Sequence, residues 1–297
     1  MVILFGFCYQ KSNKEKGAKS HQKSGNFVVF FFEFKSRLDS LLKVVILAGG
    51  FGTRLGEETD RIPKPLIQIG SMPIIWHIMK FYSSYGFSDF IICCGYKGYL
   101  IKEFFNNYAL HASNVTFDFS KDQMVVHDRK VEPWQVTLVD TGLTTMTGGR
   151  LQAVKEFLDD DAPFCMTYGD GLSDINLTNL VDFHHSSGAL ATLSAVRPPA
   201  RFGALEIIGD KVVNFSEKPF GGEGRINGGF FVLSPKTLSL IDDDRTIWER
   251  GPLETLAQQN ELNAFVHDGF WQPMDTLRDK NELNDIWDSG QAPWKRW

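Results

Sequence analysis

The feature that most constrains the fold is an apolar, β-branched run that leads directly into glycines. Residues 43–47 predict a buried strand, and the glycine-rich residues 48–52 follow without a break. Glycines allow backbone N–H groups to approach an anion closely, so this loop favours phosphate binding. Its spacing excludes a P-loop, and Leu55 stands where a dinucleotide-binding fingerprint needs a small residue. A glycine loop alone can equally be a tight turn.

Strand and helix signals alternate after the loop. Pro73 at a first helical position and Gly86 just beyond the end bound one predicted helix. This alternation predicts an α/β fold, a doubly wound, mostly parallel (Rossmann-like) sheet with helices on both faces. Strand-like runs within 115–139 and 201–233 predict antiparallel β additions to that sheet. The predicted helices are 73–85, 98–108, 151–158 and 177–185, and the predicted strands include 90–94, 164–168 and 191–196.

The charge distribution limits the classes of partner. The net charge is −5, but residues 1–43 carry eight Lys/Arg and three Asp/Glu, a net of +5. Residues 44–297 therefore carry −10, the difference between −5 and +5. An acidic body excludes nucleic acid as a partner, because binding to its phosphate backbone needs a broad basic field. A nucleotide needs only a few local cations and a metal ion.

The cysteines indicate neither zinc binding nor redox chemistry. Cys93 and Cys94 are adjacent in a predicted strand, where neighbouring side chains point to opposite faces. The sequence has no C-x-x-C spacing, so we expect buried, reduced cysteines.

Two cations strengthen the interpretation of the glycine loop as a phosphate site. Arg54 lies in the loop, and Lys64 follows between Pro63 and Pro65. The two prolines fix the local backbone, which would hold the lysine ammonium in one place. A lone lysine in such a turn would more simply be an exposed surface residue.

Together these two motifs, L-A-G-G-x-G-T-R-L and P-K-P-L, resemble the signature of the sugar-phosphate nucleotidyltransferases. In that family the loop and its arginine hold the nucleoside triphosphate, and the lysine contacts phosphate at the reaction centre. The resemblance therefore implies catalytic roles for Lys64 and Arg54. It implies nucleotide binding by Leu47, Ala48, Gly49, Gly50, Gly52, Thr53, Arg54, Lys64, Thr145, Arg150 and Gly169.

Two aspartates are candidate metal ligands. The buried run 164–168 ends at Gly169-Asp170-Gly171, and α/β sheets place ligands at the carboxyl ends of their strands. An ordinary Asp-Gly turn would have the same sequence. Mg²⁺ prefers one or two carboxylates together with phosphate oxygens and water. By resemblance, Asp170 and Asp275 form the pair that binds Mg²⁺.

Residues 141–150, T-G-L-T-T-M-T-G-G-R, resemble the loop of the branch of this family that uses CTP and glucose 1-phosphate. Thymidylyltransferases of the family carry a different sequence there. The resemblance implies CDP-glucose and pyrophosphate as products, with the product feeding deoxysugar synthesis for surface polysaccharides. It assigns the sugar phosphate to Glu217, Lys218, Asn227 and Gly228. A dTTP- or UTP-dependent enzyme and a non-catalytic nucleotide-sugar sensor remain alternatives. By resemblance we expect a homo-oligomer, with a hexamer as one candidate state.

Residues 1–41 fall outside the resemblance and are interpreted as an N-terminal extension of a catalytic domain, 42–297. Residues 11–24 are polar and Lys-rich, which predicts disorder. The Phe-rich run 27–34 is shorter than the roughly 20 residues of a membrane span. Residues 1–9 lack the features of a signal peptide, so we expect a cytoplasmic protein without a membrane anchor. A second hypothesis is that translation starts near Leu42, where relatives begin; an intact mass that includes Met1 would refute it.

Overall fold

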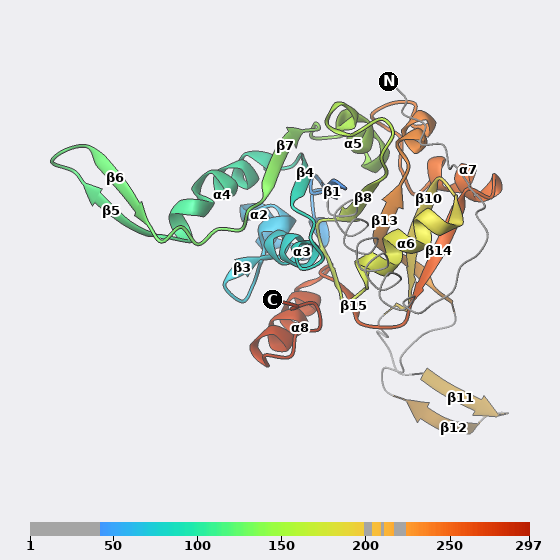
Figure 1. The fold of residues 1–297 in the computed structure, drawn as a ribbon. Coiled ribbons are helices and arrows are strands. Elements are labelled where there is room, and N and C mark those ends of the chain that lie inside the picture. Colours follow the sequence, from blue (N-terminus) through green and yellow to red (C-terminus); the bar gives the residue numbers. More distant parts are fainter. Residues whose placement is uncertain (1–41, 199–203, 209–210, 217–223) are drawn as a thin grey trace, which may run out of the picture. The chain divides into compact units, whose positions relative to one another are not determined.

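Strand β1 (Val44–Leu47) lies within a seven-stranded sheet, with β4 and β8 as its neighbours. All four of its residues are aliphatic and buried, as expected for a parallel strand covered on both faces. The computed structural model describes residues 42–198, 204–208, 211–216 and 224–297, which all belong to one compact unit, Asp39–Trp297. Figure 1 shows the arrangement.

The sheet has the strand order β14-β10-β13-β8-β1-β4-β7. Parallel pairing joins β8 to β1, β1 to β4, β4 to β7 and β10 to β14, while β13 pairs antiparallel with both β8 and β10. The prediction of a doubly wound, mostly parallel α/β sheet is confirmed. Besides β1, the sheet contains β4 (Asp89–Cys94), β7 (Gln135–Asp140), β8 (Phe164–Tyr168), β10 (Ala191–Val196), β13 (Ile226–Leu233) and β14 (Leu262–His267).

Apolar residues on the two faces of the sheet build two separate cores. Val44 and Ile46 of β1 pack on one side, and Val45 and Leu47 on the other. The first core includes residues of α3 (Ile74–Ser83), α4 (Gly98–His111), α6 (Leu177–Ser187) and α8 (Leu277–Asp288). The second includes residues of α5 (Thr147–Ala153) and α7 (Pro252–Gln258). Cys94 and Cys93 fall in different cores, so the prediction that they face opposite sides is confirmed.

Two details of the predicted helices are wrong. Pro73 is the residue that caps α3, not its first helical residue. The predicted helix 151–158 is instead α5, which begins at Thr147, followed by a separate 3₁₀ turn, Lys155–Phe157. Tertiary contacts explain the earlier start, because a Cβ on Gly148 would lie 2.7 Å from the carbonyl oxygen of Thr246. Glycine has a low intrinsic helix propensity, but the lack of a side chain on these glycines lets α5 pack closely against this segment.

The predicted antiparallel additions are partly correct. β5 (Asn114–Asp118) and β6 (Gln123–His127) form an antiparallel hairpin, as do β11 (Ala204–Ile208) and β12 (Lys211–Ser216). β7, by contrast, is a parallel edge strand of the main sheet. The prediction had grouped β7 with the additions because strand-like sequence does not reveal the direction of pairing.

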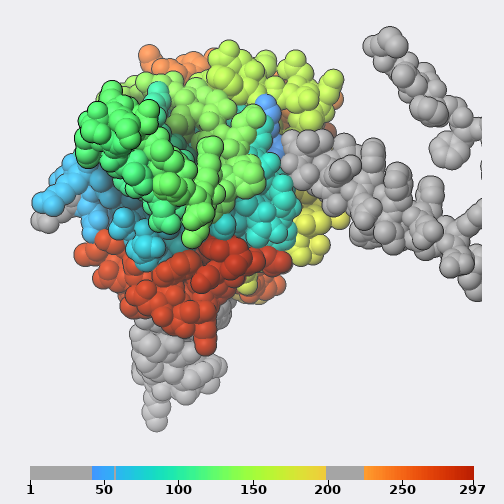
Figure 2. Space-filling view, turned by 60° about the vertical axis from the view of Figure 1, so that its left-hand side comes forward, coloured from blue at the N-terminus to red at the C-terminus, as the bar shows by residue number. Residues whose placement is uncertain are grey.

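The β5–β6 hairpin extends away from the sheet in Figure 1 and lies on the near side of the view in Figure 2, coloured green. Its apolar side chains stay exposed, with Phe119 at 92%. Among the described residues, no helix is long and apolar enough to cross a membrane.

Candidate functional site

A cavity of about 680 Å³ opens at the carboxyl ends of β1 and β8. The glycine-rich residues 48–52 form one wall, and residues 143–147 form another. This is where parallel α/β sheets bind ligands. The remaining lining comes from Leu47, Lys64, Pro65, Arg150, Thr167, Tyr168, Gly169, Asp170, Gly171, Gly228, Gly229, Trp271, Pro273 and Asp275.

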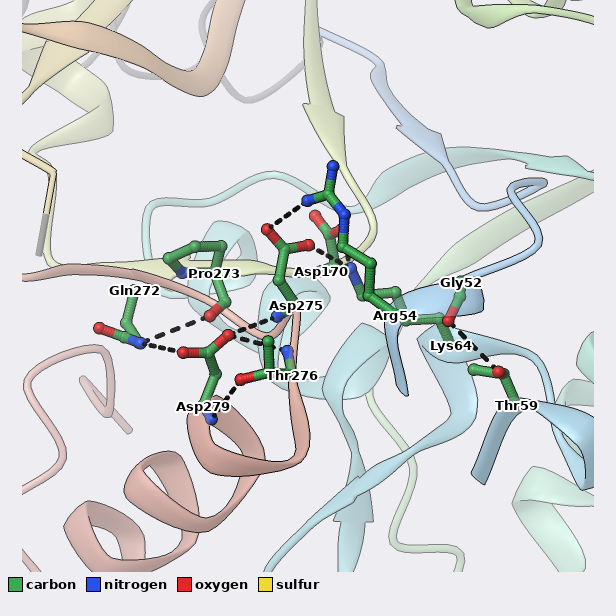
Figure 3. Close-up of polar contacts among 10 residues, drawn as sticks. All are labelled: Gly52, Arg54, Thr59, Lys64, Asp170, Gln272, Pro273, Asp275, Thr276 and Asp279. Carbon is green, nitrogen blue, oxygen red and sulfur yellow. Dashed lines mark hydrogen bonds and ion pairs between the residues drawn. The ribbon is translucent and has the colours of Figure 1, made fainter. Parts of the chain in front are cut away.

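The Lys64 ammonium lies between two carboxylates in this cavity (Figure 3). Its Nζ donates to Asp170 Oδ2 at 2.6 Å and to Asp275 Oδ1 at 2.8 Å. Arg54 Nη1 donates to the other oxygen of Asp275, Oδ2, at 3.2 Å. The Lys64 side chain is only 13% exposed, whereas that of Arg54 is 75% exposed. Four predicted site residues, Arg54 among them, therefore form one cluster.

A short sheet brings the two aspartates together across 105 residues of sequence. Asp170 comes just before β9 (Gly171–Ser173), and Asp275 follows closely after β15 (Trp271–Pro273). These strands pair antiparallel with Gly171 opposite Pro273, and Met274 N donates to the carbonyl oxygen of Asp170 at 2.8 Å. Backbone pairing, rather than the carboxylates themselves, sets their separation.

Asp279, which sequence reasoning missed, fixes the backbone of Asp275. Its carboxylate accepts from the N–H groups of Asp275 at 3.0 Å and Thr276 at 2.8 Å. The Thr276 hydroxyl accepts in turn from Asp279 N, which completes a capping box at the start of α8. The T-x-x-D spacing of these residues was a readable signal for this helix start.

The surroundings of Lys64 favour its charged form. Burial by itself would lower the pKa of Lys64, but the charges of Asp170 and Asp275 and their hydrogen bonds outweigh burial and raise it. The side chain is therefore an ammonium at neutral pH. Pro63 caps the 3₁₀ turn that begins at Lys64, and buried Pro65 follows, which fixes the backbone as the sequence indicated.

The donor set fits a small, hard divalent cation. Asp170 and Asp275 supply carboxylate oxygens at 29% and 23% side-chain exposure, close enough to share one cation. Mg²⁺ is commonly held by one or two carboxylates plus substrate phosphates and water. Among the described residues, no group of three or more His, Cys, Asp or Glu is placed to hold a metal by itself.

Close packing shapes the glycine loop. Gly52 has φ +64°, a conformation that side-chain-bearing residues rarely adopt, and the Thr59 hydroxyl donates to its carbonyl oxygen at 3.2 Å. A Cβ on Gly49 would come within 2.1 Å of the Arg150 guanidinium. The loop is thus held against Arg150 on one side and Thr59 on the other.

Arg150 uses its guanidinium to organise the walls of the cavity. Nη1 donates to Thr141 Oγ1 at 2.6 Å and to the carbonyl oxygen of Gly142 at 2.9 Å, and Nη2 donates to that of Gly49 at 3.1 Å. The residue is 5% exposed, and burial lowers its pKa from the usual arginine value. The sequence predicted that Arg150 binds the nucleotide. In the structure its guanidinium joins the 141–143 loop to the glycine loop.

The predicted site residues fall into three groups. Twelve of them line the cavity: Leu47, Ala48, Gly49, Gly50, Gly52, Lys64, Thr145, Arg150, Gly169, Asp170, Gly228 and Asp275. Thr53, Arg54 and Asn227 lie outside its lining. Glu217 and Lys218 fall outside the described residues. Thr147, Tyr168 and Trp271 also line the cavity but were not predicted as site residues.

Comparison with known proteins identifies the family. The family model of nucleotidyl transferases matches residues 43–276. The chain belongs to this family. Two relatives are glucose-1-phosphate cytidylyltransferases, of Salmonella typhimurium and of Salmonella typhi. Each is 60% identical over 256 residues, which cover 86% of this chain and all of the relative.

Solved structures agree on the fold of this nucleotidyltransferase. HddC from Yersinia pseudotuberculosis superposes with a TM-score of 0.60 at 24% identity, covering 83% of this chain and all of that one. The resemblance to a sugar-phosphate nucleotidyltransferase inferred from the sequence is confirmed.

We predict that Arg150→Met destabilises the nucleotidyltransferase fold. The substitution removes the donors to several buried carbonyl oxygens, and each buried group left unpaired costs about 1–3 kcal/mol. Urea denaturation should show a loss of about 3 kcal/mol in the free energy of unfolding. Arg54→Met, which removes an exposed guanidinium, is the control and should change that energy by less than about 1 kcal/mol. Equal effects of the two variants would contradict the structural role of Arg150.

Proposed function

We propose that the chain transfers the cytidylyl group of CTP to α-D-glucose 1-phosphate, which yields CDP-glucose and pyrophosphate. The single observation that carries the chemistry is the Lys64 ammonium between Asp170 and Asp275 in the cavity beside the glycine loop. The substrates follow from the relatives that are 60% identical over all of their length.

The reaction is a single displacement at phosphorus. An oxygen of the glucose 1-phosphate attacks the α-phosphorus of CTP, a new P–O bond forms, and the bond to the β-phosphate oxygen breaks as pyrophosphate leaves. A phosphate monoester, with a second pKa near 6, is largely dianionic at neutral pH and needs no general base. Among the described residues that line the cavity there is accordingly no histidine. His77 of α3 is buried away from the cavity lining and bonded to the carbonyl oxygen of Ile69.

The protein contributes position and charge. Backbone N–H groups of Gly49, Gly50 and Gly52 would cradle the triphosphate. The Lys64 ammonium stays charged at neutral pH and would stabilise the negative charge that develops on the phosphates. Arg54, exposed at the edge of the cluster, would add a second cation toward the triphosphate.

Enzymes of this family generally use Mg²⁺. Asp170 and Asp275 would hold it, because they supply the carboxylate oxygens that Mg²⁺ prefers. When bound, the ion would neutralise phosphate oxygens and orient them for the displacement.

Asn227 and Gly228 would contribute to the sugar-phosphate end of the cavity, together with Glu217 and Lys218. Asn227 is held in one orientation, since its Oδ1 accepts from Gly229 N at 2.8 Å and its Nδ2 donates to the Tyr168 hydroxyl at 3.4 Å.

The predictions of a homo-oligomer, a cytoplasmic location and a separate extension at 1–41 stay predictions.

Base selection would lie in residues 143–147, which line the cavity opposite the glycine loop. Leu143 and Met146 are exposed at 55% and 46%, so their apolar side chains are available to a bound base. A dTTP- or UTP-dependent transferase would use the same phosphate machinery with a different base site.

The function is tested with glucose 1-phosphate, Mg²⁺ and, separately, CTP, dTTP, UTP, ATP and GTP, while pyrophosphate release is followed. We expect release chiefly with CTP and none after EDTA is added. Release chiefly with another nucleotide would overturn the choice of base. Tight nucleotide binding with no release would favour the nucleotide-sugar sensor.

We predict that Lys64→Ala and Asp170→Ala each lower kcat by about 100-fold or more, because each removes a charge aimed at the reacting phosphates. Pyrophosphate release is measured per folded protein, with folding checked by circular dichroism. Lys155→Ala and Asp160→Ala remove exposed charges of the same kinds outside the cavity and should leave kcat unchanged. Near-normal turnover of folded Lys64→Ala would contradict the assigned role.

A further inference from the structure

Glu249 accepts hydrogen bonds from two hydroxyl groups that belong to residues of the cavity lining. Its Oε2 accepts from Thr147 Oγ1 at 2.6 Å, and its Oε1 accepts from the Tyr168 hydroxyl. Thr147 is 102 residues away in sequence and Tyr168 is 81 residues away, so the carboxylate joins two distant segments. Thr147 and Tyr168 line the cavity and Glu249 does not. Among the described residues, the side chain of Glu249 is hydrogen-bonded to the cavity lining through these two residues.

We call these contacts of the Glu249 carboxylate a bridge with two arms. The first arm, from Glu249 to Thr147, fixes the wall of the cavity that is assigned to the nucleotide. Thr147 begins α5 and ends the 143–147 wall. Its hydroxyl donates to Glu249 and accepts from the backbone N–H of fully buried Trp248 at 2.9 Å. The N–H of Met146 also donates to the carbonyl oxygen of Asp244 at 2.8 Å. The segment that carries Glu249 thus fastens the wall through both backbone and side chain.

The second arm joins Glu249 to Tyr168, in another segment of the cavity lining. Tyr168 ends β8, two residues before Asp170. Its hydroxyl donates to Glu249 and accepts from Asn227 Nδ2 at 3.4 Å, and Asn227 Oδ1 accepts from Gly229 N at 2.8 Å. Gly229 has φ +79°, and a Cβ there would lie 2.6 Å from the Tyr168 ring. Tyr168 therefore packs directly on the β13 backbone that its hydroxyl helps to orient.

A carboxylate is the group best suited to this bridge. Two acceptor oxygens receive both hydroxyl protons at once, which leaves the hydroxyl lone pairs free for Trp248 N and Asn227 Nδ2. An amide side chain has one acceptor oxygen, so one of the two hydroxyls would have to reverse its direction. In the described part of the chain, no lysine or arginine forms an ion pair with Glu249.

We propose that Glu249 is a positioning residue that couples the two substrate ends of the cavity, holding the nucleotide wall through Thr147 and the sugar-phosphate wall through Tyr168 and Asn227. The assignment of the two walls rests on the proposed function. The bridge itself rests on the hydrogen bonds of Thr147, Tyr168 and Asn227.

The kinetic test breaks each arm separately. Thr147→Val should raise KM for CTP about tenfold and Tyr168→Phe should raise KM for glucose 1-phosphate about tenfold, the scale of one lost hydrogen bond to a charged group. Glu249→Leu should raise both KM values. Glu249→Gln, which preserves shape, should raise at least one of them while the melting temperature stays within about 4 °C of wild type. Glu254→Gln, an exposed carboxylate in the first turn of α7, should leave both KM values unchanged.

A double-mutant cycle separates coupling from general destabilisation. In the Tyr168→Phe background, Glu249→Leu should raise KM for CTP but should not raise KM for glucose 1-phosphate further, because that arm is already broken. A residue with only a structural role would add the same loss in both backgrounds. Unchanged KM values in folded Glu249→Leu and Glu249→Gln would overturn the proposal.

Hydrogen exchange tests the bridge without any substrate. The amides of Trp248 and Gly229 are each bonded to a side chain that the bridge orients. Glu249→Leu should speed exchange at both amides, and Glu254→Gln at neither. If Glu249→Leu speeds exchange at both amides but the wild-type protein releases no pyrophosphate, the proposed function is refuted and the bridge still stands. Normal turnover with unchanged exchange would refute the bridge and leave the function standing.

Discussion

The carboxylates of Asp170 and Asp275 both lie within hydrogen-bond distance of one ammonium group, that of Lys64. Two carboxylates this close repel each other unless a cation lies between them. The lysine supplies that cation inside a cavity where its own burial is compensated only by the two charges. The arrangement makes the cluster sensitive to any added phosphate or metal ion, because either one changes the balance of charge around Lys64.

The rest of the fold can be understood from the need to hold this cluster. Parallel β1 and β8 bring the glycine loop and Asp170 to one edge of the sheet. The β9–β15 pair then carries Asp275 to the same place, and the Asp279 capping box fixes its backbone. Arg150 and Glu249 act at a greater distance, joining loops that the sheet alone would leave independent. Backbone pairing sets the coarse geometry, and hydrogen bonds from charged side chains refine it.

The sequence predicted those parts of the molecule whose signals are local. The aliphatic run of β1, the glycines after it and the prolines around Lys64 each constrain the backbone by themselves, so the fold class was predicted correctly and most of the motif residues lie around one cavity. The start of α5 could not be read in this way, since Gly148 and Gly149 favour a helix only when packed against residues 244–246. The direction of β7 depends on its pairing with β4, which its own residues do not reveal. Tyr168 and Glu249 belong to no short motif, because their roles arise from contacts between distant segments.

The most direct test of this account is the position of a metal ion relative to Lys64. Crystals of the protein grown with CDP-glucose and Mn²⁺ in place of Mg²⁺ would locate the ion by its anomalous scattering. The account predicts a peak within coordination distance of both Asp170 and Asp275, with the Lys64 ammonium turned toward the phosphates. A peak bound by neither aspartate, or a Lys64 that still bridges both carboxylates beside bound product, would contradict it.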